Sequence, residues 1–129
     1  MNTILKKRAE YTDARGTIET LVDNLDFKSV LRITSTVGSV RANHKHKVDY
    51  HVCVLTKGKM KYYERPENSK EKPSVVEINP GDIFYTPPTA EHAMQFLEDS
   101  EFWCFSKLSR AQENYEADTV RLVDDLTKL

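Results

Sequence analysis

Short stretches of apolar and β-branched residues, separated by turn residues, run through the middle of the chain. The first alternates between apolar and polar positions over residues 30–37 and stops at Gly38, the pattern of a half-buried strand. Six more stretches have the composition of strands, over residues 51–55, 60–64, 75–78, 83–86, 92–97 and 102–106. Many short strands at nearly even spacing favour an all-β, antiparallel sandwich or barrel. We expect its core to contain Val52, Val54, Ile83, Met94, Phe102 and Trp103.

The turns and the two ends of the chain complete this organisation. Residues 56–59, Thr-Lys-Gly-Lys, predict a hairpin turn between two strands. A chain of 129 residues suffices for one core and is short for two. We therefore predict a single domain over residues 1–129, with a core of about 30–107 and extensions over 1–29 and 108–129. The C-terminal extension is expected to be partly helical, in one or two turns over residues 111–117.

Charge and composition exclude several classes of partner. Lys and Arg number 19 and Asp and Glu number 20, so nucleic acid has no electrostatic attraction to the whole protein. No stretch approaches the ~18 apolar residues of a membrane span, and the first residues become charged before a signal peptide could form. We expect a cytoplasmic protein that binds neither nucleic acid nor membranes. Cys53 and Cys104 lie in apolar runs and are expected to be buried free thiols.

The four histidines are concentrated in two places. His44, His46 and His51 lie within eight residues, and His92 begins a strand after the Pro87-Pro88 break. Residues two apart on a strand point to the same face, so His44 and His46 can bind one ion together. Neutral imidazole is a common ligand for Zn, Fe, Ni, Cu and Mn. The sequence therefore predicts a site for one divalent transition metal, to which a hairpin would add His51 and a distant strand His92.

The spacing around the first three histidines resembles the first motif of the cupin family. Gly38, His44, His46 and Gly58 occupy the positions of the motif, and His51 stands where it has a glutamate. Residues 81–96 resemble the second cupin motif. Its matching positions are Gly81, Pro87 and His92, whereas Thr89 and Phe96 replace a glycine and an asparagine.

The cupin resemblance covers about residues 30–107 and implies a single small jelly-roll barrel with a metal inside its open mouth. It assigns the three motif histidines as ligands, with His51 in the glutamate position; Asp49 and Tyr50 compete for that position if the spacing slips. Losing the glutamate charge favours Fe, Ni, Cu or Zn over Mn. The resemblance also implies a homodimer formed by strand exchange, for which the segment before Val30 is available.

Residues 38–47, in which Arg41 precedes the histidine pair, are similar to the cupin-type nucleotide-sugar 3,4-ketoisomerases. In those enzymes the two histidines transfer protons and no metal is needed. This similarity predicts an isomerase or epimerase acting on a nucleotide-activated sugar in surface-polysaccharide biosynthesis. The candidate catalytic residues are His44, His46, Tyr85 and Arg41, with Arg41 as the binder of a carboxylate or phosphate. Glu91 is expected to be an exposed loop charge.

Two other functions fit the same histidines. A metal held by neutral histidines in a cupin resembles the Fe(II) dioxygenases, which bind O₂ and a chelating substrate. A non-catalytic barrel that binds a sugar or a small acid is the third possibility. All three have a small molecule as partner, and the sequence does not separate them.

Overall fold

The computed structural model describes residues 3–129 and consists mainly of β-strands. The strands are β1 (Arg8–Asp13), β2 (Gly16–Thr20), β3 (Ser29–Ser35), β4 (Val40–His46), β5 (His51–Lys57), β6 (Met60–Arg65), β7 (Ser74–Ile78), β8 (Ile83–Thr86), β9 (Glu91–Phe96), β10 (Ser100–Ser106) and β11 (Thr119–Arg121). Helix α1 (Gln112–Asp118) and the 3₁₀ turn η1 (Leu126–Lys128) lie in the C-terminal extension. The predicted strands and the helical turns of the tail are all present.

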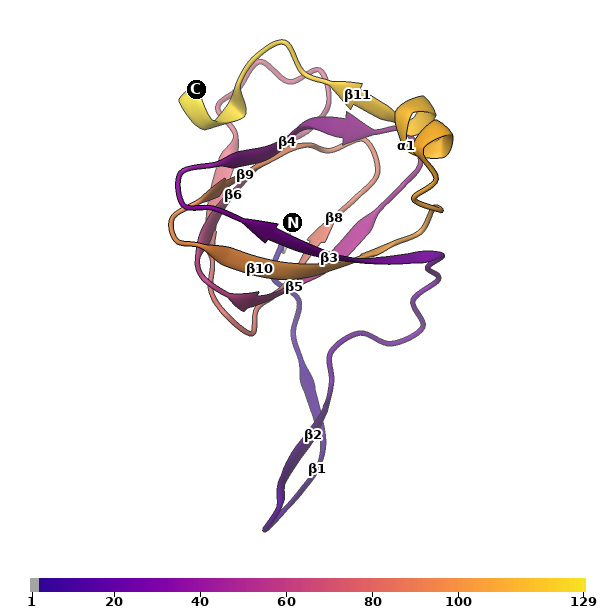
Figure 1. Cartoon of the computed structure of the whole chain (residues 1–129), viewed down its shortest axis with the longest axis vertical. Coiled ribbons are helices and arrows are strands. Elements are labelled where there is room, and N and C mark those ends of the chain that lie inside the picture. Colours follow the sequence, from indigo (N-terminus) through magenta and orange to yellow (C-terminus); the bar gives the residue numbers. More distant parts are fainter. Residues whose placement is uncertain (1–2) are drawn as a thin grey trace.

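Two antiparallel sheets form the body of the molecule (Figure 1). One has the strand order β3-β10-β5-β8 and the other the order β11-β4-β9-β6-β7. The prediction of an antiparallel all-β fold is thus confirmed. Over residues 3–129 no ladder joins the two sheets, so the predicted closure into a continuous barrel is not shown.

The turn at Gly58 connects the two sheets, and the prediction of a hairpin there is wrong. β5 pairs with β10 and β8, whereas β6 pairs with β7 and β9. Gly58 has a φ of 91°, and a Cβ at this position would lie 2.1 Å from Ser100 Oγ, so glycine is needed. β4 and β5 also belong to different sheets. His51 therefore reaches the other histidines across the core and not through a hairpin.

The core fills the space between the two sheets. Its central cluster consists of Cys53, Leu55, Met60, Tyr62, Ile78, Phe84, Met94, Phe96, Phe102 and Cys104. Both cysteines are buried and free, as predicted. Trp103 differs from the prediction, because its side chain is 38% exposed. It alternates along β10 with the buried Phe102 and Cys104 and so points to the outer face of the sheet.

Both extensions contain strands that the sequence pattern did not predict. β1 and β2 form a hairpin that projects from the body (Figure 1). Between the N-terminus and this hairpin, Thr3 and Leu5 make backbone hydrogen bonds to β8. At the other end, β11 pairs with the histidine-bearing half of β4. No helix among the described residues is long and apolar enough to cross a membrane.

Candidate functional site

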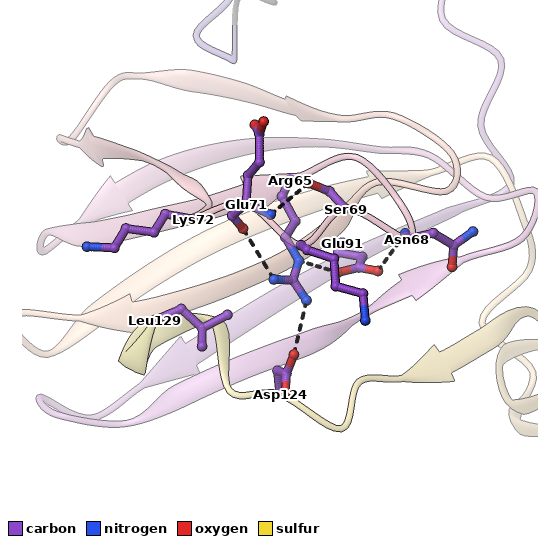
Figure 2. A pocket seen from close by; sticks show the side chains of 9 residues that line it. Arg65, Asn68, Ser69, Glu71, Lys72, Glu91, Asp124 and Leu129 are labelled. Carbon is purple, nitrogen blue, oxygen red and sulfur yellow. Dashed lines mark hydrogen bonds and ion pairs between the residues drawn. The ribbon is translucent and has the colours of Figure 1, made fainter.

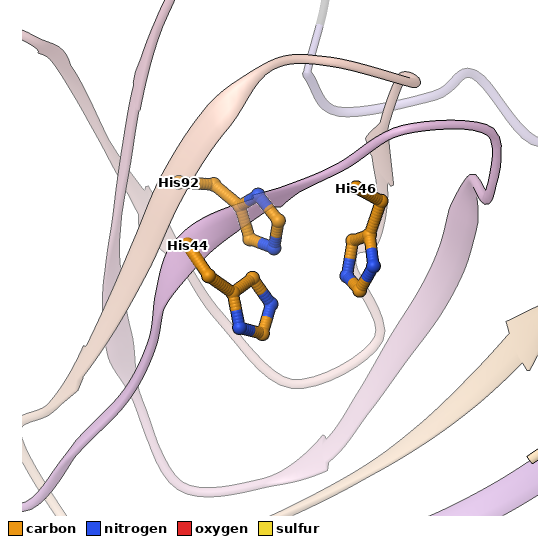
Figure 3. Close-up of side chains that lie close together, drawn as sticks. All are labelled: His44, His46 and His92. Carbon is orange, nitrogen blue, oxygen red and sulfur yellow. The ribbon is translucent and has the colours of Figure 1, made fainter. Parts of the chain in front are cut away.

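Three histidines converge on one point inside the body (Figure 3). His44 and His46 lie two apart on β4, and His92 lies opposite His44 on the adjacent strand β9. The rings of His44 and His92 are 4.7 Å apart, and those of His44 and His46 are 4.6 Å apart. One nitrogen from each ring lies within 4.8 Å of the other two. The predicted pairing of His44 with His46, and the arrival of His92 on a distant strand, are both present.

His51 approaches this cluster from the facing sheet. It forms a second group with His46 and Asp49, whose ligand atoms also lie within 4.8 Å of one another. Its Nε2 is 3.1 Å from Asp49 Oδ2, and its ring is 4.6 Å from that of His46. His46 is thus common to two groups, and His51, which is paired with a carboxylate, belongs to a separate group from His44 and His92.

The three convergent histidines are neutral at pH 7. Burial and the neighbouring histidines together lower the pKa of His44 to about 3. Burial and the charge of His51 lower the pKa of His46 to about 4, against the opposing effect of Asp49 and Asp118. Burial also lowers the pKa of His92 well below its ordinary value. Nε2 of His46 and Nε2 of His92 are buried without a hydrogen-bond partner, whereas Nδ1 of His46 faces the Asp118 carboxylate. Neutral imidazoles with free nitrogens are the donors that a transition metal requires, so these residues fit a metal ion.

The pKa of His51 is shifted in the opposite direction, upward. Burial alone would lower its pKa, but the hydrogen bond to Asp49 and the contact with Cys104 outweigh burial and raise the pKa to about 10. His51 is therefore protonated at neutral pH, and its positive charge lies beside three neutral rings.

Asp118, the last residue of α1, is a site residue that sequence reasoning missed. Its Oδ2 lies 3.2 Å from His46 Nδ1. Its carboxylate also accepts hydrogen bonds from the backbone N–H groups of Val48, at 2.8 Å, and Asp49, at 3.3 Å. Asp118 lies in an extension without a recognisable motif, so only the fold reveals this contact.

Arg41 and Tyr85, two predicted catalytic residues, are not brought to the histidines. The guanidinium of Arg41 donates to Ser35 Oγ at 2.6 Å and to the carbonyl of Thr34 at 2.9 Å, and it lines a separate cavity. Tyr85 lies opposite Val52 in the β5–β8 ladder, while the next pair, His51 and Thr86, faces the interior. Their catalytic roles stay predictions, and the geometry gives them no part in the cluster.

A cavity of about 610 Å³ opens beside the site, at the end of the body where β6 and β8 finish. Glu64 lines this cavity and lies opposite His92 in the β6–β9 ladder. Its carboxylate accepts a hydrogen bond from Tyr62 Oη at 2.7 Å, and burial raises its pKa. A polar ligand in this cavity would therefore lie next to the strand that carries His92.

Glu91 is buried, so the prediction that it is an exposed charge is wrong. It accepts a 2.6 Å hydrogen bond from Arg65 Nε and a second bond from the backbone N–H of Asn68 (Figure 2). Arg65 also contacts Asp124 at 3.5 Å on the other side of the same polar pocket. The pair fastens the end of β6 to the start of β9, which carries His92.

No protein-family model and no curated protein sequence matches the chain. Solved structures match well. QdtA, a sugar 3,4-ketoisomerase from Thermoanaerobacterium thermosaccharolyticum in complex with TDP, has a TM-score of 0.71 and 18% identity, covering 97% of this chain and 90% of QdtA. A 3,4-ketoisomerase from Helicobacter canadensis has a TM-score of 0.72 and 17% identity over 97% of this chain and 93% of its own.

The dTDP-4-dehydrorhamnose 3,5-epimerase from Sulfolobus tokodaii is also similar, with a TM-score of 0.68 and 18% identity over 87% of this chain and 72% of its own. These neighbours are RmlC-like cupins. The chain therefore shares the cupin-like fold of these neighbours, as its two sequence motifs predicted.

Proposed function

We propose that this chain is a metal-binding isomerase or epimerase acting on a keto sugar that is joined to a nucleotide. One observation carries the proposal: neutral histidines with unpartnered nitrogens converge inside an RmlC-like fold. The structural neighbours that act on nucleotide-linked sugars support this class of substrate.

The reaction requires removal of a proton next to a keto group and stabilisation of the resulting enolate oxygen. His44, His46 and His92 would hold a divalent transition metal, which supplies a Lewis acid for that oxygen. His51 carries a positive charge on the opposite side of the cluster, because Asp49 keeps it protonated. That charge favours the enolate over the ketone.

The same residues also suit proton transfer when no metal is bound. His46 Nε2 has no hydrogen-bond partner, and its Nδ1 faces the Asp118 carboxylate. A carboxylate in this position orients an imidazole and stabilises its protonated form. Without a metal, His46 would therefore take the proton at Nε2. A nitrogen bound to a metal cannot also take a proton, so the metal content decides between the two forms.

The cavity beside Glu64 offers hydrogen-bonding groups that suit a sugar. Its lining contains the hydroxyl groups of Ser69, Ser74 and Thr89 and the carboxylates of Glu64, Glu67 and Glu71. Hydroxyls and carboxylates both hydrogen-bond to the hydroxyl groups of sugars. We therefore place the sugar at the histidines, with this cavity beside it.

The test begins with metal analysis of protein purified without a histidine tag. The protein is then incubated in D₂O with a panel of 4-keto nucleotide sugars that includes TDP-4-keto-6-deoxyglucose, and deuterium in the ring carbons is followed by NMR. We expect exchange by the wild type and by Lys45→Gln, and none by His44→Asn. Lys45 is the matched control, since it lies between the two histidines and pairs with Glu67 at 3.2 Å.

Absence of exchange with every sugar of the panel contradicts the proposal. Oxygen uptake by the Fe(II)-loaded protein with diketones or flavonols would instead identify a dioxygenase. Ligand binding that survives His44→Ala and His92→Ala, without turnover, would identify a binding module.

A further inference from the structure

The histidine cluster is closed to solvent by the C-terminal extension. His44 is 8% exposed, His46 2% and His92 1%. A sugar cannot touch side chains that are covered to this degree. If the cluster acts on any ligand, some element above it has to move.

Helix α1 is the element that covers the cluster. The ring of Tyr115 lies 6.4 Å from that of His44 and 6.2 Å from that of His46. On the other side of Tyr115, the guanidinium of Arg110 lies 3.6 Å from the ring centroid. Tyr115 therefore occupies the space above the two histidines, where a bound sugar would have to lie.

Few interactions hold α1 in place. The helix has seven residues and no side-chain hydrogen bond at its N-terminus. Only Tyr115 and Asp118 are turned toward the body, and the other five helix residues are exposed. Helices this short do not persist without tertiary contacts. The main attachment of α1 is therefore at Asp118, whose carboxylate accepts hydrogen bonds from the backbone of Val48 and Asp49 and whose carbonyl accepts one from Lys47 N–H at 2.9 Å.

We propose that residues 109–118 form a movable cover over the histidines, with Asp118 as its latch and Tyr115 as a residue that contacts the bound sugar. The Asp118 latch also orients the ring of His46, so closure of the cover and orientation of this ring occur together. An aromatic ring packs well on the C–H face of a sugar, and Arg110 would then lie beside the attached phosphates. The sugar contact rests on the proposed function, whereas the cover does not.

The cover is tested by the chemical reactivity of the histidines. Diethyl pyrocarbonate modifies accessible neutral imidazoles, and peptide mass spectrometry gives the rate for each residue. We expect Asp118→Ala to raise the rates of His44 and His46 at least about tenfold, because local opening exposes them. Glu113→Ala, on the exposed side of the same helix, is the matched control and should leave the rates unchanged. Equal rates in Asp118→Ala and wild type overturn the proposal.

Hydrogen exchange of the wild type tests the latch without any substitution. The backbone amides of Val48 and Asp49 donate to Asp118, so they should exchange together with the amides of α1. The amide of Ala93, in the buried part of β9, should exchange far more slowly. If the α1 amides are as well protected as that of Ala93, the cover does not open and the proposal is overturned.

The sugar contact is tested with TDP-4-keto-6-deoxyglucose as the probe. We expect Tyr115→Ala to raise KM about tenfold while kcat stays nearly constant, since the ring binds and takes no part in the chemistry. Tyr115→Phe should restore the wild-type KM. An unchanged KM in Tyr115→Ala overturns the contact. If the wild type does not bind the probe, the sugar contact fails, and the histidine reactivity alone decides on the cover.

Discussion

Nδ1 of His46 lies 3.2 Å from Oδ2 of Asp118, so a histidine of the central cluster is held by a residue of the C-terminal helix. A carboxylate at this position fixes the tautomer of a metal-bound imidazole and raises its basicity. We predict that Asp118→Asn lowers the affinity for Co(II) or Zn(II) about 10–100-fold, measured by competition with a chromophoric chelator. His44→Asn should lose stoichiometric binding, and Lys45→Gln should keep it. An unchanged affinity in Asp118→Asn would show that the contact has no effect on the metal.

The protein treated with a chelator should lose stability in acid. The pKa values of His44 and His46 are about 3 and about 4, below the value of about 6.5 for a free histidine. Between about pH 4 and about pH 6.5 the unfolded chain binds protons that the folded chain does not, so folding becomes less favourable as pH falls. Each of the two histidines should make the free energy of unfolding roughly 2 kcal/mol lower at about pH 5 than at neutral pH. Urea denaturation at several pH values measures this change.

His51 should make the stability of the fold depend on pH in the alkaline range, where stability falls as pH rises. Its pKa in the folded chain is about 10, so above about pH 6.5 the folded chain holds a proton that the unfolded chain releases. Its contribution to stability is complete below about pH 6.5 and is lost as pH rises toward 10. We expect maximum stability near about pH 6.5, and His51→Gln should flatten the alkaline side of the curve. A wild-type curve that stays flat above about pH 6.5 would contradict the ion pair with Asp49.

The sequence was informative where a local pattern determined the geometry. Alternation and turn residues located the core strands, and the H-x-H spacing placed His44 and His46 on one face, because side chains on a strand repeat every two residues. The cupin spacing then brought His92 to them. It did not reveal that His51 pairs with Asp49 and lies in the facing sheet.

Elsewhere the local pattern had too little information. β8 reads Ile-Phe-Tyr-Thr, without the alternation that would show which face is buried, so the outward position of Tyr85 could not be predicted. The contacts of Asp118 with His46, and of Glu91 with Arg65, join segments that are distant in sequence. Only the packing of the whole chain brings such pairs together.

The buried ion pair between Arg65 and Glu91 should contribute strongly to stability. The two side chains are 9% and 6% exposed, and Arg65 Nε lies 2.6 Å from Glu91 Oε1. Glu91→Gln leaves the buried guanidinium with the longer 3.5 Å contact to Asp124 as its ion pair, and we expect it to lower the free energy of unfolding by about 2–3 kcal/mol. Glu67→Gln removes the exposed partner of Lys45 and should cost less than about 1 kcal/mol. Urea denaturation compares the two variants, and equal effects would contradict a special role for the buried pair.

Two exposed apolar surfaces are candidates for the interface of the predicted homodimer. The first is the projecting β1–β2 hairpin, whose opposed residues Tyr11 and Ile18 are 57% and 64% exposed. An isolated two-stranded hairpin is marginally stable and gains from a surface to pack on. The second is an apolar groove of about 420 Å³ on the outer face of the four-stranded sheet. It is lined by Leu21, Val22, Leu25, Phe27, Val52, Val54, Thr56, Trp103 and Phe105.

We predict that the hairpin of each chain packs in the groove of a second copy. The hairpin and the groove-lining residues together give about 22 residues a side, within the roughly 20–30 of a standard interface. Analytical ultracentrifugation should find a species of twice 14.9 kDa for the wild type. Ile18→Asp and Trp103→Arg should each be monomeric, whereas Val123→Ser, which changes an exposed valine outside both surfaces, should remain dimeric.

Mixing the two monomeric variants tests direct contact between hairpin and groove. Ile18→Asp retains an intact groove and Trp103→Arg an intact hairpin, so a mixed dimer regains one of the two contacts that a symmetric dimer makes. We expect heterodimers to form in the mixture, at lower affinity than the wild-type dimer. A monomeric wild type contradicts the dimer itself. Dimeric single variants, or a mixture that stays monomeric, would show that these two surfaces do not bind each other.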